Sequence, residues 1–122
     1  MFINISNHPS SKWSPAQLAA AGGKVIDIPF PNVPPTATPA EVEEMAQRLL
    51  DEVAKHGFFH THTAMVQGEF SLTYALTGML IRLGTEVVVA TSFERKSVEN
   101  PDGSKTVVFE FVQFRRIYAI EQ

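Results

Sequence analysis

One junction constrains the fold more than any other stretch of this 122-residue sequence. A short apolar run at residues 64–66 ends in Gln67 and Gly68, and a helical pattern begins at once. The apolar residues of that pattern recur at i, i+4, i+7, i+8 and i+11, which is one face of an amphipathic helix. These residues are Leu72, Leu76, Met79, Leu80 and Leu83. The junction predicts a strand, a glycine turn and a helix whose free backbone N–H groups attract an anion, most often phosphate.

The same alternation of strand and helix precedes this junction. Apolar segments at residues 2–6 and 25–28 are each followed by a helical pattern. Ser14 and Thr38 are the expected N-caps of these helices, since each is followed by proline and, two residues later, by Gln or Glu. A third strand is expected within residues 58–67. Strands that alternate with helices imply βαβ crossovers and a mostly parallel sheet.

The last third of the chain has a different pattern. Residues 85–91 contain the unbroken apolar run of a strand buried on both faces. Residues 92–99 are polar and charged, residues 100–104 form a turn signal, and residues 106–120 are rich in Val, Phe, Ile and Tyr. We expect the fourth strand to extend beyond the sheet and to return as an antiparallel fifth strand. The predicted fold is α/β, a single three-layer Rossmann-like or flavodoxin-like domain over residues 1–122, with strand order 2-1-3-4-5 and a C-terminal antiparallel β-hairpin.

Composition narrows the class of protein. The chain is long enough for one domain with a genuine core, and its 44% hydrophobic and 19% charged residues are those of an ordinary globular protein. A net charge of −3 argues against non-specific binding of long nucleic acid. The lack of cysteine excludes disulfides and thiol chemistry. With neither a leader peptide nor an apolar run near 18 residues, we expect a cytoplasmic protein without membrane contact.

The expected strand order places the ligand cleft at the carboxyl ends of the first and third strands. Residues 6–13 and 67–73 would line this cleft, with residues 29–32 and 91–96 on its flanks. The polar loop within residues 6–12 suits a grip on phosphate and ribose, in which Lys12 offsets phosphate charge and His8 transfers protons. It is equally typical of a turn that leads into the following helix. Trp13 either stacks on a base or packs as a hydrophobic staple.

Three further groups of side chains each allow two interpretations. Glu69 either stabilises the helix dipole, or it receives a ligand hydroxyl or acts as a base. Arg95 and Lys96 either contact phosphate across the rim of the cleft or lie on an exposed hairpin. The pair His60 and His62 would share one strand face, but a metal needs a third ligand and the pair lies at the opposite end of the sheet. We therefore expect no metal and no other cofactor.

Aromatic residues in the last strand point to self-association. Phe109, Phe111 and Phe114 are typical of core positions or of a dimer surface rather than of a base-stacking platform. A long apolar edge strand needs to be covered. A homodimer is therefore expected.

Four segments resemble a known family. They read FINISNHP at residues 2–9, MVQGEFSLT at residues 65–73, ATSFER at residues 90–95 and FVQFR at residues 111–115. Together they resemble small CRISPR-associated Rossmann-like proteins, the stand-alone relatives of CARF domains that accompany type III systems, some of which are ring nucleases. The resemblance implies a homodimer whose two clefts meet on a two-fold axis and bind a cyclic oligoadenylate, with cyclic tetra-adenylate as the expected ring. Some members cleave it without metal, by attack of a ribose 2′-hydroxyl on the adjacent phosphate, and others only bind it.

The resemblance also implies the residues of the site. Ligand contacts would come from Ser6, Asn7, His8, Ser10, Gln67, Gly68, Glu69, Thr73, Thr91 and Ser92. The expected catalytic set is Ser11, Lys12, Arg95 and His8, because such enzymes pair a hydroxyl with a cation. The alternative function is a non-catalytic nucleotide-binding sensor or sponge that regulates a partner. A third is a small enzyme acting on an unrelated phosphorylated metabolite.

Overall fold

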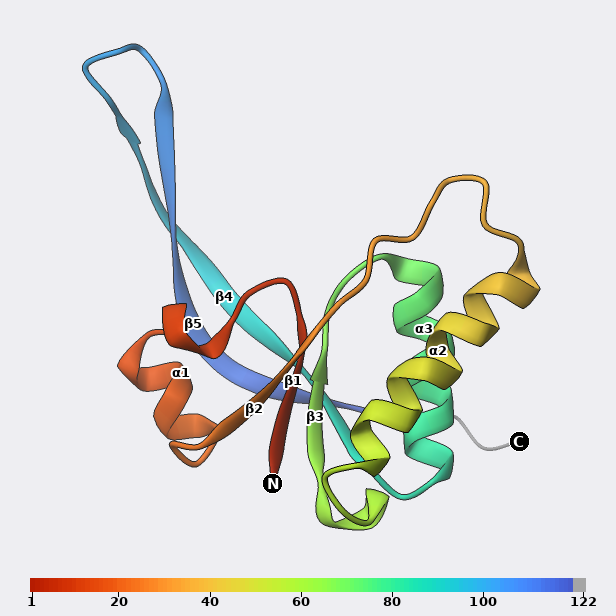
Figure 1. Cartoon of the computed structure of the whole chain (residues 1–122). Helices are drawn as coiled ribbons and strands as arrows, with labels where there is room; N and C mark the ends of the chain where they lie inside the picture. The colour runs from red at the N-terminus through yellow and green to blue at the C-terminus, as the bar shows by residue number, and fades with distance from the viewer. Residues whose placement is uncertain (120–122) are drawn as a thin grey trace.

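The computed structural model describes residues 1–119, with the side chains of residues 94–96 and 107–108 outside the description (Figure 1). Three strands and three α-helices alternate along the first two thirds of these residues, and two further strands follow as a long hairpin. The strands are β1 (Phe2–Ser6), β2 (Val25–Pro29), β3 (Thr63–Val66), β4 (Glu86–Glu99) and β5 (Lys105–Ile117). The helices are α1 (Pro15–Ala20), α2 (Pro39–Ala54) and α3 (Phe70–Arg82), with 3-10 turns η1 (Ser10–Lys12) and η2 (Phe59–Thr61).

The five strands form one sheet in the order β2-β1-β3-β4-β5. The pairings β1–β2, β1–β3 and β3–β4 are parallel, whereas β5 runs antiparallel to β4. The predicted strand order and the predicted hairpin are therefore confirmed. The expected end of the last strand, residue 120, lies outside the described residues.

The alternation of side chains along β1 separates two cores, one on each face of the sheet. Ile3 and Ile5 are fully buried against the face that α2 and α3 cover. Phe2 lies on the other face, where it packs with Trp13 next to α1. Figure 1 shows α1 on one side of the sheet and α2 with α3 on the other. The larger core comprises Ile28, Phe30, Val42, Ala46, Leu49, Leu50, Val53, Leu72, Leu76 and Leu80 among others.

Local sequence explains where the helices begin. Thr38 caps α2 through a capping box: its hydroxyl accepts from the backbone N–H of Glu41, and the Glu41 carboxylate accepts from the backbone N–H of Thr38, both at 3.2 Å. Ser14 caps α1 by accepting from the backbone N–H of Gln17. Such caps typically contribute about 1 kcal/mol each. Among the described residues, no helix combines the length and the apolar character that crossing a bilayer requires.

Beyond the body of the sheet, β4 and β5 continue as a two-stranded projection, here called the arm (residues 92–111; Figure 1). The register shifts between Thr91 and Ser92, where the arm begins, and again within residues 94–96. The turn at its tip is closed by a hydrogen bond of 2.7 Å from the backbone N–H of Asn100 to the carbonyl of Ser104. The exposed side chains of Phe93 and Phe109 lie on this ribbon, away from the core.

Candidate functional site

A buried asparagine organises the loop at the carboxyl end of β1. Asn4 is 1% exposed and pairs in register with Asp27 of β2. Its Nδ2 donates to Oδ1 of Asp27 at 2.9 Å and to the carbonyl of His8 at 2.8 Å. Its Oδ1 accepts from the hydroxyl of Ser6 at 2.6 Å. Because a buried polar group must be satisfied inside the protein, these bonds tie the loop to the sheet.

Ser10 and Trp13 also hold this loop. Together with Asn4, Ser6 and Asp27 they form what we call the anchor. The Asp27 carboxylate accepts from the backbone N–H of Ser10 at 3.1 Å and from the Ser10 hydroxyl at 2.8 Å. The Trp13 indole N–H donates to the carbonyl of His8 at 3.0 Å. The Trp13 ring is buried between Phe2 and Phe114, with ring centroids 6.0 Å apart in both cases. We call residues 7–12, held in this way, the loop platform.

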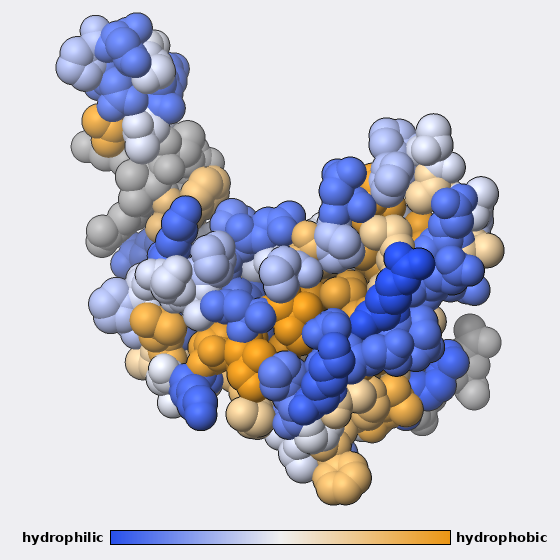
Figure 2. Space-filling view, viewed as in Figure 1, coloured by the Kyte–Doolittle hydropathy of each residue, from blue (hydrophilic) through white to orange (hydrophobic). Residues whose placement is uncertain are grey.

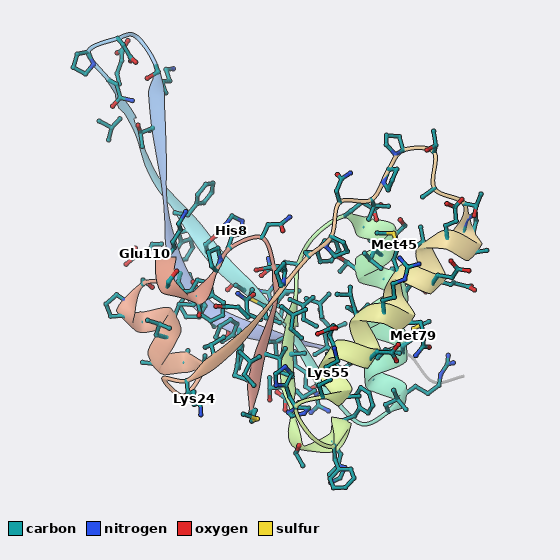
Figure 3. The ribbon with its side chains drawn as sticks, viewed as in Figure 1. His8, Lys24, Met45, Lys55, Met79 and Glu110 are labelled. Atoms are coloured by element: carbon teal, nitrogen blue, oxygen red, sulfur yellow. The ribbon has the colours of Figure 1, made fainter. Side chains whose placement is uncertain are left out.

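The anchor decides between the two interpretations of the loop, residue by residue. The hydroxyls of Ser6 and Ser10 bind the protein's own groups, which favours the turn over the ligand grip at these positions. Trp13 packs in the core and is not open to stack on a base. The exposed polar members of the platform are Asn7, His8, Ser11 and Lys12. Figure 3 shows His8 on the rim of the molecule, beside the base of the arm.

Gln67 bridges two strands that separate. The β3–β4 pairing ends at Met65 and Val88, and beyond it the Gln67 side-chain carbonyl accepts from the backbone N–H of Ala90 at 3.0 Å. The Gln67 backbone N–H donates to the carbonyl of Ile5 at 3.1 Å. The residue therefore continues the sheet at the point where β4 leaves it.

Gly68 is explained by packing. A Cβ at this position would lie 2.4 Å from the buried ring of Phe30, and the backbone is not left-handed. Only glycine leaves room for Phe30, so the residue type needs no ligand to account for it. On the adjoining α3, the Thr73 hydroxyl is buried and has no hydrogen-bond partner.

Glu69 is the N-cap of α3. Its carboxylate accepts from the backbone N–H groups of Ser71 and Leu72, both at 2.9 Å, and from the Ser71 hydroxyl. The Ser71 hydroxyl and these two N–H groups hold the pKa of Glu69 below its ordinary value. The chain's own carboxylate thus occupies the place that we expected an anion to take at this helix end, and a phosphate there would meet a negative charge.

The residues predicted on β4 lie at the start of the arm and along it. The Thr91 hydroxyl donates to the carbonyl of Gln113 at 3.2 Å, and Ser92 is exposed. The side chains of Arg95 and Lys96 lie outside the described residues, although their backbone belongs to β4. By strand rise, position 95 lies about 10 Å beyond Ser92. The predicted rim contact is therefore placed on the arm rather than on the body of the sheet.

The His60–His62 pair was expected on one strand face, and this expectation is wrong. His60 lies in the η2 turn, exposed and stacked on Phe58 with ring centroids 5.8 Å apart, and β3 begins only at Thr63. His62 is 3% exposed, and both of its ring nitrogens lack a hydrogen-bond partner. Burial lowers the pKa of His62. Across the part of the chain that the structure describes, no three His, Asp or Glu side chains gather as metal ligands.

Two hollows lie at the amino edge of the parallel strands, opposite the predicted cleft. One, of about 590 Å³, lies between α1 and the sheet, and the other, of about 460 Å³, lies at the C-terminal end of α3. They share Thr63, Glu86 and Arg116, and none of the predicted site residues lines either. At the carboxyl edge, Figure 2 shows a saddle between the arm and the opposite lobe of the molecule.

The sequence contains a signal for the anchor that the predicted site does not include. Asn4 and Asp27 each stand at the third position of a five-residue strand whose other residues are mostly apolar. A polar residue in the middle of a short, mostly apolar strand indicates a polar partner nearby. Two such residues at equivalent positions of neighbouring parallel strands indicate that they bind each other. The structure buries Asn4 and leaves Asp27 exposed on the edge strand β2.

Comparison with known proteins places the chain in a family. A model of the uncharacterized protein MJ1673 family matches residues 1–115, which include the body of the sheet and the arm. The chain belongs to this family. No curated protein and no solved structure matches the chain. Family membership therefore identifies related sequences without assigning a reaction.

Proposed function

We propose that this protein binds a cyclic oligoadenylate at the loop platform and cleaves it, which would switch off type III CRISPR signalling. Cyclic tetra-adenylate is the first candidate ligand. The proposal rests on the resemblance to CARF-related ring nucleases and on a CARF-like, three-layer Rossmann-like interpretation of the fold. The observation that carries it is the loop platform itself, which holds exposed polar side chains at the switch point between β1 and β3. Ligands of open α/β sheets bind at such a point.

The exposed platform residues suit a phosphodiester. On the platform, the ammonium group of Lys12 offsets phosphate charge, and the Ser11 hydroxyl donates to a non-bridging oxygen. The proposal assigns the second cation to Arg95, from β4 of the arm. His8 accepts the proton of a ribose 2′-hydroxyl while its oxygen attacks the adjacent phosphorus. The bond from phosphorus to the 5′-oxygen breaks, and this oxygen takes up a proton. The products carry a 2′,3′-cyclic phosphate and a 5′-hydroxyl, and no water or metal is consumed.

A cytoplasmic homodimer is part of this proposal. A cyclic tetranucleotide has two-fold symmetry, and two platforms related by a two-fold axis would present identical groups to its two halves. The arm supports self-association because Phe93 and Phe109 are 68% and 65% exposed on it. In the dimer, Asn7 and Ser92 would contact the ligand. Ser6, Ser10, Gln67 and Gly68 would act through the backbone that they position.

The alternative is a sponge or sensor that binds the messenger and leaves it intact. One observation favours it: the hydroxyls of Ser6 and Ser10 and the carboxylate of Glu69 are all bound to the protein's own groups. Within the loop platform, the Ser10 hydroxyl donates to the Asp27 carboxylate, and this bond holds the loop on the sheet. Turnover would then depend entirely on the hydroxyl of the substrate.

Incubation of the purified protein with cyclic tetra-adenylate in EDTA, followed by chromatography, separates these functions. Linear products with cyclic phosphate ends establish the nuclease, and intact ligand that co-elutes with the protein establishes the sponge. Intact ligand that does not co-elute, with other ring sizes also failing, overturns both.

Two variants test the assigned roles. We expect His8→Ala to lose cleavage and keep binding. Lys12→Ala should weaken binding by about 10- to 100-fold, the worth of one charge-assisted hydrogen bond. The matched control is Lys55→Ala at the end of α2, which should change neither.

A further inference from the structure

The outer face of α3 carries large aromatic side chains that nothing in the described chain covers. Phe70 and Tyr74 are 78% and 74% exposed, and their ring centroids lie 6.1 Å apart. Gly78 lies one turn further along the same face. The opposite face is buried in the core through Leu72, Leu76 and Leu80. The helix therefore has an apolar interior face and an unpartnered aromatic exterior face.

No described residue of the chain explains why position 78 is glycine. A Cβ at this position would meet no atom within 4 Å, and the backbone is not left-handed. Glycine inside a helix is less favourable than alanine because it has more conformational freedom to lose. At Gly68 a Cβ would clash with the ring of Phe30, which explains the glycine, whereas a Cβ at Gly78 would clash with nothing. Close approach of another molecule would supply the reason.

We propose that this face of α3 binds the α3 helix of a second copy of the chain, antiparallel and about a two-fold axis midway between Tyr74 and Gly78. In this arrangement each Tyr74 ring lies over the Gly78 of the partner, where no side chain obstructs it. One turn further out, about 6 Å along the axis, each Phe70 meets the partner's Arg82 end. A two-fold contact requires such self-complementarity, in which residue i meets j and j meets i.

The charges of α3 fit the same arrangement. From Phe70 to Ile81 the helix has no charged side chain, as is typical of the centre of an interface. Its flanking charges are opposite in sign, Glu69 at the N-terminus and Arg82 in the last turn. Antiparallel pairing brings each Glu69 toward the other Arg82, and it places that guanidinium within reach of the Phe70 ring. A parallel pair would instead set like charges against each other.

This contact is separate from the proposed ligand cleft. Antiparallel α3 helices direct the carboxyl edges of the two sheets in opposite directions, so the two loop platforms do not meet across it. The association therefore needs no ligand. It can be tested whether or not a cyclic oligoadenylate binds.

Disulfide trapping tests the register directly, because the natural chain has no cysteine. Tyr74→Cys and Gly78→Cys chains with tags of different mass are mixed and oxidised. We expect cross-linking between the two different chains to exceed that of either chain with itself by at least tenfold. In the proposed pair, position 74 of one chain and position 74 of the other are offset by about 6 Å along the helices. Added to the separation of the helix axes, this offset exceeds the reach of a disulfide. The control mixes Tyr74→Cys with Gln47→Cys on exposed α2.

Sedimentation of the full chain gives the second measurement. Tyr74→Lys and Gly78→Lys should each weaken self-association at least tenfold and leave the circular dichroism spectrum unchanged, since both positions are exposed. Gly78→Ala should raise the melting temperature and still weaken association, which a merely structural glycine would not do. Glu44→Lys on α2 is the control for added positive charge. The proposal is overturned if the mixed chains cross-link no faster than the control pair, or if association survives both lysine variants.

Discussion

At the scale of single residues, a buried ring determines which residue position 68 accepts. The Phe30 side chain is 5% exposed, and its ring occupies the space that a Cβ at position 68 would need, at the turn from β3 into α3. A ring packed in the core has little freedom to move aside. The strand-to-helix turn and the core are therefore coupled through this one contact.

We expect Gly68→Ala to destabilise the protein by about 1–3 kcal/mol, the usual cost of overpacking. Urea unfolding followed by circular dichroism measures this change. Gly78→Ala is the matched control, since an added methyl group there meets nothing within 4 Å. An unchanged midpoint for Gly68→Ala would show that Phe30 can shift.

His62 makes stability depend on pH. Burial is the first cause of its lowered pKa, and the nearby N-terminal ammonium group, His56 and His60 act in the same direction, whereas the Gly57 backbone opposes it. The unfolded chain therefore takes up a proton at a higher pH than the folded chain. The contribution of the neutral imidazole is complete above the unfolded pKa of about 6.5 and is lost as pH falls through the lower folded pKa.

Thermal unfolding between pH 7.5 and pH 5 should show this loss as a falling melting temperature. His62→Leu should reduce the dependence of melting temperature on pH, because position 62 then has no imidazole to take up a proton. His56→Gln, a change at an exposed site, should keep most of it. Equal slopes for His62→Leu and the natural protein would assign the pH dependence to other groups.

At the scale of elements, the arm and the loop platform differ in how they are held. The platform is tied to β1 and β2 through Asn4 and Asp27. The arm is a two-stranded ribbon, a form with little stability of its own in water. One of its faces continues the aromatic cluster of the core outward from Phe114 to Phe111, whose ring centroids lie 5.0 Å apart. Its outer part, among the side chains that the structure describes, has no comparable anchor.

Removal of the outer arm should leave the body folded. We expect a chain in which Phe93 is joined to Glu110 through Asn-Gly to melt within about 4 °C of the natural protein, because those two positions are paired and the turn type suits a hairpin. Differential scanning calorimetry measures this. The control shortens only the tip, at residues 100–104. A fall well beyond this range would show that the arm stabilises the body.

At the scale of the whole molecule, the two edges of the sheet offer different surfaces. The carboxyl edge has the loop platform and the N-terminus of α3, whereas the amino edge has the two hollows and the buried His62. The two hollows at the amino edge have volumes of about 590 and 460 Å³. The proposal nevertheless places the ligand at the carboxyl edge, because the switch point and the exposed cation lie there.

Titration of ¹⁵N-labelled protein with cyclic tetra-adenylate decides between these edges. We expect the amide shifts to change in residues 7–12 and around Gln67, and not around Lys24 or Arg116. Unlabelled AMP is the control for simple mononucleotide binding. Changes confined to the amino edge would move the site to the hollows.

The sequence by itself determined the elements and their order. The spacing of apolar residues distinguished helix from strand, proline with Ser or Thr marked the starts of α1 and α2, and the turn at residues 100–104 marked the hairpin. Each of these signals depends on neighbours within a few residues. The two-residue period of a strand and the 3.6-residue period of a helix are local properties of the chain.

Only the tertiary structure decided which polar groups remain available. Asn4 and Asp27 are 23 residues apart in the chain and 2.9 Å apart through their side chains, and this contact commits Ser10 to the anchor. Phe30, at the end of β2, reaches Gly68 after β3. His60 lies in the η2 turn and His62 follows it, so the two histidines do not share a strand. Whether a side chain binds a ligand or its own protein depends on partners that are distant in sequence, and these become neighbours only when the sheet assembles.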